Sequence, residues 1–294
     1  MTRIGPAGWA YKDWRGIVYP ERRPRGFSEL SFLARYFDTI EINVSFYRPL
    51  AAKTAADWLE KICDNRHFRF TAKLWRGFTH ERTASAEDEK IFKEGFAPLL
   101  DAGRFGALLL QFPWSFRNSP ENRDYVASLR GRFADYPLVL EVRHVSWAEP
   151  GMLDWLAQLS LGLCNIDQPL FKRSITPSAL TTSAVGYVRL HGRNYQSWFR
   201  ENKFAGERYD YLYSLPELGP WLDRIKTVER AAEDTYVVTN NHYLGKAVVN
   251  ALEMIAILGD KPVTVPESLL ERYPELRDYA MQSDGPHQLS LPTD

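Results

Sequence analysis

Acidic, basic and amide side chains recur at the carboxyl ends of short apolar segments. The acids are Glu41, Glu141 and Asp167. The bases and amides in equivalent places are Lys73, Arg143, Arg189, His191, Asn43, Gln111, Asn165 and Asn240. Burying a charged side chain is energetically costly unless the charge is paired or hydrogen-bonded. Charged side chains at the ends of so many apolar segments are therefore expected to form a functional site. These residue types are suited to acid–base catalysis. The candidate catalytic residues are Glu41, Lys73, Glu141, Asp167 and His191.

Strand-like and helix-like segments alternate along the chain and would position these side chains. Strands are predicted over residues 4–9, 39–43, 70–73, 108–111, 138–143, 163–167, 187–191 and 236–241. Helices are predicted over residues 27–37, 52–62, 85–102, 121–133, 150–161, 218–232 and 244–258. Ser28 is a candidate N-cap, and Ser85-x-x-Asp88 resembles a capping box. About eight βα units therefore follow one another.

Such alternation indicates a parallel sheet with right-handed crossovers. Eight units predict an α/β fold, a single (β/α)8 TIM-barrel-like domain over residues 1–260. An open doubly wound sheet is the rival, but no Gly-x-Gly-x-x-Gly follows the first strand. The segment after Asp167 is predicted to be a loop, and the long aromatic loop 192–216 is predicted to cover the strand exits. Residues 261–294 are predicted to be an extension that is packed peripherally or partly disordered.

Alternation within the strands predicts where the polar side chains point. Successive side chains of a strand lie on opposite faces, so Glu41 and Asn43 oppose Ile40 and Ile42. The same alternation sets Glu141 with Arg143, Arg189 with His191, and Asn165 with Asp167. The aliphatic face must contact the helices, so all these polar residues are predicted to point into the barrel. They come late in each strand and therefore gather at the carboxyl mouth, where barrel active sites lie.

Composition excludes several functional classes. The 294 residues are 45% hydrophobic and 25% charged, with a formal net charge of zero, so nothing global favours a nucleic-acid or membrane partner. The N-terminal residues lack the apolar core of a signal peptide, and no apolar run is long enough to cross a membrane. Only Cys63 and Cys164 occur, which argues against a disulfide framework or an iron–sulfur centre. These features predict a cytoplasmic protein.

A series of uncommon motifs resembles the YecE-like family, domain of unknown function 72. The motifs run from about Gly5 to Leu258 in this order: Gly8-Trp9-x-Tyr11-x-x-Trp14-x-Gly16, Tyr19-Pro20, Glu41-Ile42-Asn43-x-x-Phe46-Tyr47-Arg48, Lys73 with Thr79-His80, Gln111-Phe112-Pro113, Glu141-Val142-Arg143-His144-x-x-Trp147, Arg189-Leu190-His191-Gly192-Arg193, Tyr209-Asp210-Tyr211, and Asn240-Asn241 with Asn250-Ala251. The resemblance implies a TIM-barrel-like fold and a bacterial or archaeal cytoplasmic protein. It brings no established reaction.

The favoured hypothesis is an enzyme, a hydrolase, lyase or isomerase, that acts on a small anionic substrate bearing phosphate or carboxylate. Arginine binds such groups bidentately, and barrels often bind phosphate near their last strands. The predicted substrate-binding residues are Trp9, Tyr11, Asn43, Arg48, Gln111, Arg143, Arg189, Arg193, Asn240 and Asn241. Loop aromatics could stack on a sugar or base, or simply fill the mouth.

Several alternatives remain beside this hypothesis. Lys73 could form a Schiff base, but a salt bridge with Glu41 is favoured over it. Paired carboxylates could serve glycoside hydrolysis. No cofactor is predicted, although carboxylates and imidazoles suit a divalent metal; its candidate ligands are Glu41, Glu141, Asp167, His191 and His144.

The alternative from a different class is a non-catalytic protein that binds a phosphorylated ligand or nucleic acid. Its contact residues would be Arg48, Arg143, Arg193, Arg200 and Lys203 with loop aromatics. Such binding would weaken steeply with salt. A further alternative is a barrel whose lumen charges only pair with one another.

Overall fold

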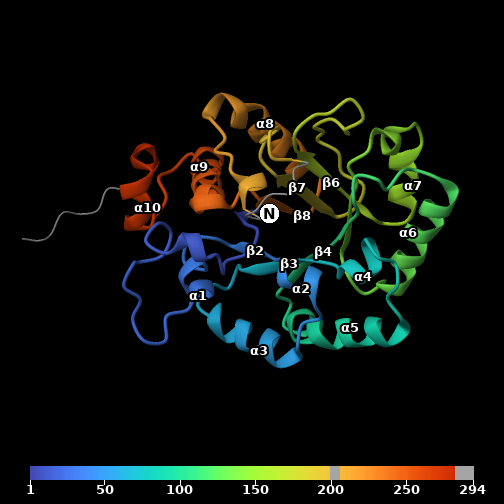
Figure 1. The fold of residues 1–294 in the computed structure, drawn as a ribbon, viewed down its shortest axis with the longest axis horizontal. Helices are drawn as coiled ribbons and strands as arrows, with labels where there is room; N and C mark the ends of the chain where they lie inside the picture. Colours follow the sequence, from blue (N-terminus) through green and yellow to red (C-terminus); the bar gives the residue numbers. More distant parts are fainter. Residues whose placement is uncertain (199–205, 282–294) are drawn as a thin grey trace, which may run out of the picture.

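Eight parallel strands form the centre of the computed structural model, which describes residues 1–198 and 206–281 (Figure 1). The strands are β1 Thr2–Pro6, β2 Thr39–Ile42, β3 Arg69–Lys73, β4 Phe105–Gln111, β5 Leu138–Glu141, β6 Gly162–Asp167, β7 Val185–Leu190 and β8 Asp234–Thr239. Each strand pairs in parallel with the next, and β8 pairs with β1. A parallel bridge between Ala7 and Glu41 joins β1 to β2, so the sheet closes on itself. The predicted (β/α)8 barrel is confirmed.

Helices lie outside the strands, as Figure 1 shows. They are α1 Glu29–Leu33, α2 Val44–Tyr47, α3 Ala52–Lys61, α4 Arg76–Thr79, α5 Ala86–Asp101, α6 Pro120–Arg132, α7 Met152–Gln158, α8 Leu215–Ala231, α9 Lys246–Gly259 and α10 Glu267–Arg272. Five 3-10 turns accompany them in the described residues: η1 Lys12–Trp14, η2 Val145–Ala148, η3 Glu207–Tyr209, η4 Tyr243–Gly245 and η5 Pro274–Asp278. No helix of this part of the chain is long and apolar enough to span a membrane.

The two faces of the strands contribute to two separate apolar clusters. One cluster fills the lower lumen with Ala107, Leu109, Val139, Cys164, Ile166, Tyr187, Tyr236 and Val238 together with Ala7. The other lies between the strands and the helices and contains the alternate strand residues, such as Ile40, Leu108 and Val188. The aliphatic residues of most strands therefore face the helices, as predicted, and this leaves the upper lumen for polar side chains.

Side-chain caps define where several helices begin. The predicted N-cap Ser28 accepts a hydrogen bond from the Ser31 N–H. The predicted capping box of Ser85 and Asp88 starts α5. Ser214 forms an additional capping box with Glu217, so α8 begins at Leu215, earlier than predicted. At α9 the helix begins at Lys246 instead of residue 244, because Leu244 and Gly245 both adopt left-handed backbone angles.

Replacing Ser119 with Ala is expected to lower the free energy of unfolding by about 1 kcal/mol. Ser119 has the extended backbone of an N-cap, and its hydroxyl accepts a hydrogen bond from the Asn122 N–H at 3.3 Å. Urea denaturation followed by circular dichroism measures the change. Ser128→Ala is the matched control, because Ser128 is exposed within the same helix and is expected to shift stability by about 0.5 kcal/mol or less. Equal effects of the two substitutions would contradict the capping role.

The connection between β6 and β7 contains no helix among its residues, 168–184, which are all described. This agrees with the predicted loop after Asp167. The loop supplies polar backbone groups to the outer side of β6, where other strands contact apolar helix faces. For example, Leu180 O accepts a hydrogen bond from the Asn165 side chain at 2.8 Å. Polar side chains of β6, such as Asn165, can therefore be satisfied on the outer side of the strand.

The C-terminal segment packs against the outside of the barrel as far as it is described. Leu269 and Leu276 are buried in the outer core. The Tyr273 hydroxyl donates a hydrogen bond to Leu244 O at 2.8 Å, and Val263 pairs with Ala280 in a parallel bridge. The predicted tail beyond residue 281 lies outside the described residues, as do Arg200 and Lys203 of the predicted loop.

Candidate active site

Polar side chains occupy the upper lumen directly above the apolar layer. The lumen-facing positions continue from apolar to polar along each strand: Val139 is followed by Glu141 on β5, and Tyr187 by Arg189 on β7. Since parallel strands share one carboxyl end, these side chains meet at the mouth of the barrel. The sequence prediction for this part of the site agrees with their positions.

Arg189 lies at the centre of the cluster and bridges two carboxylates. Its guanidinium donates to Glu41 Oε1 at 2.8 Å and to Glu141 Oε2 at 2.5 Å, and all three side chains are fully buried. The Tyr187 hydroxyl donates to the second oxygen of Glu41 at 3.0 Å. Burial by itself raises the pKa of Glu141, but Arg189, His191 and Arg143 together hold that pKa well below its usual range. Glu141 is therefore an ionised partner for arginine.

His191 completes the surroundings of Glu141 as a neutral imidazole. Its Nε2 lies 3.2 Å from Glu141 Oε1, and its Nδ1 lies 3.0 Å from the Asn240 amide nitrogen. Burial lowers the pKa of His191 to about 3. The asparagine N–H donates to Nδ1, so the ring proton belongs on Nε2, where it donates to the carboxylate. Arg143 contacts the same carboxylate oxygen at 2.8 Å.

Lys73 reaches the same mouth from β3 without an acidic partner among the described residues. The predicted salt bridge with Glu41 is wrong for this part of the chain, because Arg189 and Tyr187 occupy the two oxygens of that carboxylate. No described carboxylate oxygen lies within 4.0 Å of Lys73 Nζ, which instead sits over the Phe46 ring at 5.0 Å. Burial, followed by the charge of Arg189, lowers the pKa of Lys73 to about 8.

Asn165 and Asp167 correct the predicted orientation of β6. The lumen-facing residues of this strand are Cys164 and Ile166, so the two polar side chains point outward. Asn165 binds the β6–β7 loop, and Asp167 accepts a hydrogen bond from the Trp221 indole of α8 at 3.0 Å. The prediction that they join the lumen cluster is wrong, because the outer side of β6 offers both side chains polar partners, the β6–β7 loop for Asn165 and the Trp221 indole of α8 for Asp167.

Asp167 instead anchors the loop that follows β7. Arg193 approaches both oxygens of this buried carboxylate, with its Nε at 3.0 and 3.1 Å. Further along, the loop places the buried Trp198 ring over Arg143, with the guanidinium carbon 5.7 Å from the ring centroid, and 6.2 Å from the His191 ring. Trp198 of the predicted aromatic loop therefore lies over the mouth.

The sequence family matches this barrel along nearly its whole length. The family described as "Protein of unknown function DUF72" covers residues 3–274. The chain belongs to this family. The predicted resemblance to YecE-like proteins is confirmed by the same match and by the UPF0759 protein YecE of Escherichia coli, which is 28% identical over 155 residues, 51% of this chain and 52% of YecE.

Two further relatives of this DUF72 chain are more completely aligned. The UPF0759 protein YunF of Bacillus subtilis is 27% identical over 275 residues, 88% of this chain and 95% of YunF. The crystal structure of a DUF72 family protein from Thermotoga maritima is 32% identical, with a TM-score of 0.77 over 88% of this chain and 99% of that protein. These similarities support the fold and the family, and they name no reaction.

A pocket beside the mouth of this DUF72 barrel contains four of the predicted substrate-binding residues. Its volume is about 540 Å³, and it is lined by Trp9, Tyr11, Asn43 and Arg48 together with Trp58 and neighbouring residues. The rings of Trp9 and Trp58 meet edge to face at 5.0 Å. The Asn43 side-chain nitrogen donates to the Tyr11 hydroxyl at 3.3 Å, and that hydroxyl donates to the carbonyl of Ala7, a residue of the lumen cluster, at 2.6 Å.

The remaining predicted binding residues separate into two groups. Gln111 and Asn240 continue lumen-facing series, and Asn240 contacts His191 as described above. Asn241 points outward, where its amide nitrogen donates to Tyr211 O and to Asn250 Oδ1, both at 2.8 Å. Arg193 also lies outside the lumen, against Asp167. Asn241 and Arg193 therefore support the loop after β7 and do not line the mouth.

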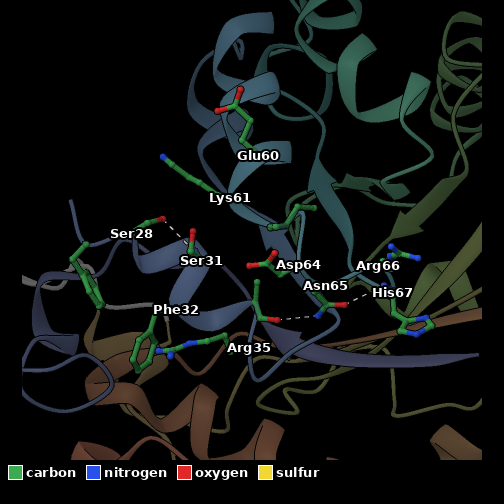
Figure 2. A pocket seen from close by; sticks show the side chains of 13 residues that line it. Ser28, Ser31, Phe32, Arg35, Glu60, Lys61, Asp64, Asn65, Arg66 and His67 are labelled. Carbon is green, nitrogen blue, oxygen red and sulfur yellow. Dashed lines mark hydrogen bonds between the residues drawn. The ribbon is translucent and has the colours of Figure 1, made fainter. Parts of the chain in front are cut away.

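A larger hollow lies away from this site. About 840 Å³ in volume, it is formed by α1 and the segment from Glu60 to His67, which leads into the amino end of β3. Figure 2 shows its polar and basic side chains, including Arg35 and Lys61. None of the candidate site residues lines it, so volume alone does not mark the candidate site.

Residues 1–198 and 206–281 contain no group of three or more His, Cys, Asp or Glu side chains that could hold a metal ion. Glu41 and Glu141 are engaged by arginine. His144 begins η2, and its Nδ1 accepts a hydrogen bond from the Ser146 N–H at 3.1 Å. The side chains proposed as ligands therefore serve other contacts.

Three residues at the mouth were not assigned a role from the sequence. Gln168 directly follows β6 and is almost completely buried. His80 packs edge to face on Phe46, which also contacts Lys73. His242 stacks on Tyr11 with ring centroids 4.2 Å apart. The alternation signal could have found Gln168 had the register of β6 been assigned from Cys164 and Ile166, whereas the two histidines follow the strands in turns where alternation ends.

Proposed function

We propose that this protein is an enzyme that performs acid–base chemistry on a small anionic substrate at the carboxyl mouth of the barrel. Lys73 is the base in this proposal. The observation that carries it is the half-buried ammonium of Lys73, which has no carboxylate partner among the described residues. The substrate would bear a phosphate or carboxylate, and the reaction would be a hydrolysis, lysis or isomerisation.

The charge balance of the lumen supports an anionic substrate. The carboxylates that face it in the described chain are Glu41 and Glu141, and the cations are Lys73, Arg143 and Arg189. His191 is neutral, so one positive charge is left over. A buried charge without a partner is unfavourable, and a bound anion would neutralise it. Arg143 is the arginine that retains some exposure, with 14% of its side chain accessible.

The pKa of Lys73 supports its role as the base. General bases work best when their pKa lies near the operating pH, and burial with a neighbouring cation lowers the pKa of Lys73 to about 8. Glu141 is less suited to proton transfer because its pKa is held well below its usual range. In this proposal the two carboxylates hold Arg189 in place, and Arg143 and Arg189 stabilise negative charge that develops on the substrate.

Lys73→Met is expected to lower kcat/KM by about 100-fold or more for any substrate that the wild type converts. Phosphomonoesters, sugar phosphates and oxo acids would be incubated with the protein and followed by ³¹P and ¹H nuclear magnetic resonance. The wild-type kcat/KM should rise with pH and level off above about pH 8, since the neutral amine is the base. Lys73→Arg, which keeps the charge but not the titration, should retain binding and lose turnover.

Lys12→Met is the control, because Lys12 is an exposed residue of η1. Unchanged turnover in Lys73→Met would contradict the assigned base. Binding of inorganic phosphate to the wild type without conversion of any compound in the series would contradict the catalytic part of the proposal and favour a binding protein.

A further inference from the structure

Buried hydrogen-bonding atoms without a partner in the described chain gather at the lumen mouth. They are Asn43 Oδ1, Gln111 Oε1, Arg189 Nε, His242 Nδ1 and both side-chain amide atoms of Gln168. A buried polar atom with no partner costs roughly 1–3 kcal/mol. Other such atoms occur elsewhere in the described chain, but the atoms at the mouth come from five different strands or the residues that follow them. Such a concentration indicates groups that are kept free for a ligand.

Gln168 is the most informative member of this group. Its side chain is 1% exposed, yet neither its amide nitrogen nor its amide oxygen has a partner. The His191 N–H donates to Asp167 O at 2.9 Å, so the parallel pairing of β6 and β7 continues to this level. Alternation from Cys164 and Ile166 therefore places the Gln168 side chain on the lumen side.

Asn165, on the outer side of β6, shows that the fold can satisfy a buried amide. Asn165 donates to Leu180 O and Tyr187 O and accepts from the Ser178 hydroxyl and the Leu180 N–H. Gln168, only three residues later, has none of these contacts. The two amides lie on opposite sides of β6, and the one that faces the lumen has neither of its amide atoms satisfied by a described residue, which points to a use for Gln168 inside the mouth.

The free atoms include both donors and acceptors. Arg189 Nε and Gln168 Nε2 carry hydrogens, whereas Asn43 Oδ1, Gln111 Oε1 and Gln168 Oε1 accept them. A carboxylate ion offers acceptors alone, and a hydrogen phosphate ion carries at most one or two hydroxyl donors, so neither can satisfy all three of these oxygens. Hydroxyl groups donate and accept at once, and a set of hydroxyls can satisfy both kinds of atom.

We propose that the mouth binds a polyhydroxylated anion, a sugar acid or a sugar phosphate, with its charged end at Arg143 and its hydroxyls at Gln168, Gln111 and Asn43. This proposal rests on the proposed function for the anionic end and names the class of the rest of the substrate. The pocket lined by Trp9, next to Asn43, offers further room for a sugar body. Sites that hydrogen-bond a hydroxyl strongly reject analogues that lack it.

The test compares matched ligands by isothermal titration calorimetry. The pairs are gluconate with hexanoate, and ribose 5-phosphate and glucose 6-phosphate with inorganic phosphate, so that the carboxylate and phosphate sources are distinguished. For the carboxylates, the phosphates or both, the hydroxylated compounds should bind the wild type at least about 10-fold more tightly than their partner without sugar hydroxyls. A factor of about 10 is the effect of one well-made hydrogen bond. Gln168→Leu should remove this preference and leave the affinity for inorganic phosphate unchanged.

Gln168→Leu also separates recognition from a structural role. Leu has a similar volume and no hydrogen-bonding group, so the Tm of the free protein should stay the same or rise, whereas a structural amide would make it fall. Gln158→Leu at the exposed end of α7 is the matched control. Equal affinities within both pairs, no binding by any hydroxylated anion, or an unchanged preference in Gln168→Leu would overturn the proposal.

Its failure is distinct from failure of the proposed function. In one case binding depends on the hydroxyl groups, Gln168→Leu removes that dependence, and no compound is converted. This result would support the proposed ligand class and contradict catalysis by Lys73. In the other case turnover depends on Lys73, is the same with and without hydroxyl groups on the substrate, and is unchanged in Gln168→Leu. This result would support the proposed function and contradict the proposed ligand class.

Discussion

Replacing Arg189 with Met is expected to lower the free energy of unfolding by about 3–5 kcal/mol, because the substitution leaves two buried carboxylates without their shared cation. Glu41 and Glu141 are both fully buried, and each accepts a hydrogen bond from a different nitrogen of this guanidinium. Urea denaturation at pH 7, followed by circular dichroism and by tryptophan fluorescence, measures the loss.

Two matched variants separate the buried charge from the lost side chain. Arg189→Met combined with Glu41→Gln removes the carboxylate that has no other cation in the described chain, while Glu141 keeps its contact with Arg143, and should recover much of the stability. Arg23→Met breaks the Arg23–Glu29 ion pair, whose side chains are 29% and 31% exposed, and should cost about 1 kcal/mol or less. A cost for Arg189→Met no larger than that of Arg23→Met would show that the network does not contribute as the geometry implies.

Alternation was sufficient to place much of this network from the sequence. In β2, β5 and β7 the outer face is covered by helices, so one face of each strand is aliphatic and the other is free to be polar. That constraint assigns Glu41, Glu141 and Arg189 to the lumen without any knowledge of tertiary contacts. Their place late in the strand then puts them at the mouth, since all eight strands run in the same direction.

The same rule failed on β6 because its premise does not hold there. No helix connects β6 to β7, and the loop that does so presents polar backbone groups to Asn165. A polar residue can then be favourable on the outside, and Cys164 and Ile166 take the lumen. The absence of a helix after Asp167 is visible in the sequence, but alternation alone does not tell which face of β6 meets polar groups.

Pairing across the lumen was beyond what the sequence could decide. Lys73 and Arg189 both reach the mouth, and either could pair with Glu41 on charge alone. The outcome depends on the stagger of strands that are far apart in the chain and on the fork of the guanidinium, which reaches Glu41 and Glu141 together. Lys73 carries a single ammonium and is left without a carboxylate partner in the described chain.

Glu253→Gln is expected to raise the free energy of unfolding by about 1–3 kcal/mol at pH 8 and to leave it nearly unchanged at pH 4.5. Glu253 lies on α9 under the C-terminal segment and is 6% exposed. Burial, with a further contribution from Glu275, raises the pKa of Glu253 from 4.5 to about 7, although a hydrogen bond from Asn250 opposes the shift. No periodic or motif signal marked this residue in the sequence.

The direction of the pH dependence follows from this raised pKa. The folded protein holds the Glu253 proton more tightly than the unfolded chain, so the stability associated with the proton is complete below about pH 4.5 and is lost as the pH rises to about 7. Gln stays neutral throughout and can still accept the hydrogen bond that Asn250 donates at 2.7 Å, so the advantage of the variant should grow over that interval.

Denaturation of wild type and variant at pH 4.5, 6 and 8 tests this dependence, with Glu271→Gln on the exposed surface of α10 as the control. A gain that is constant across pH would assign the effect to packing or hydrogen bonding instead of ionisation. A loss at pH 8 would show that the carboxylate is stabilised where it lies. Because Glu253 contacts Asn250, which also binds Tyr213 and Asn241, its proton links the packing of the C-terminal segment to the support of the loop over the mouth.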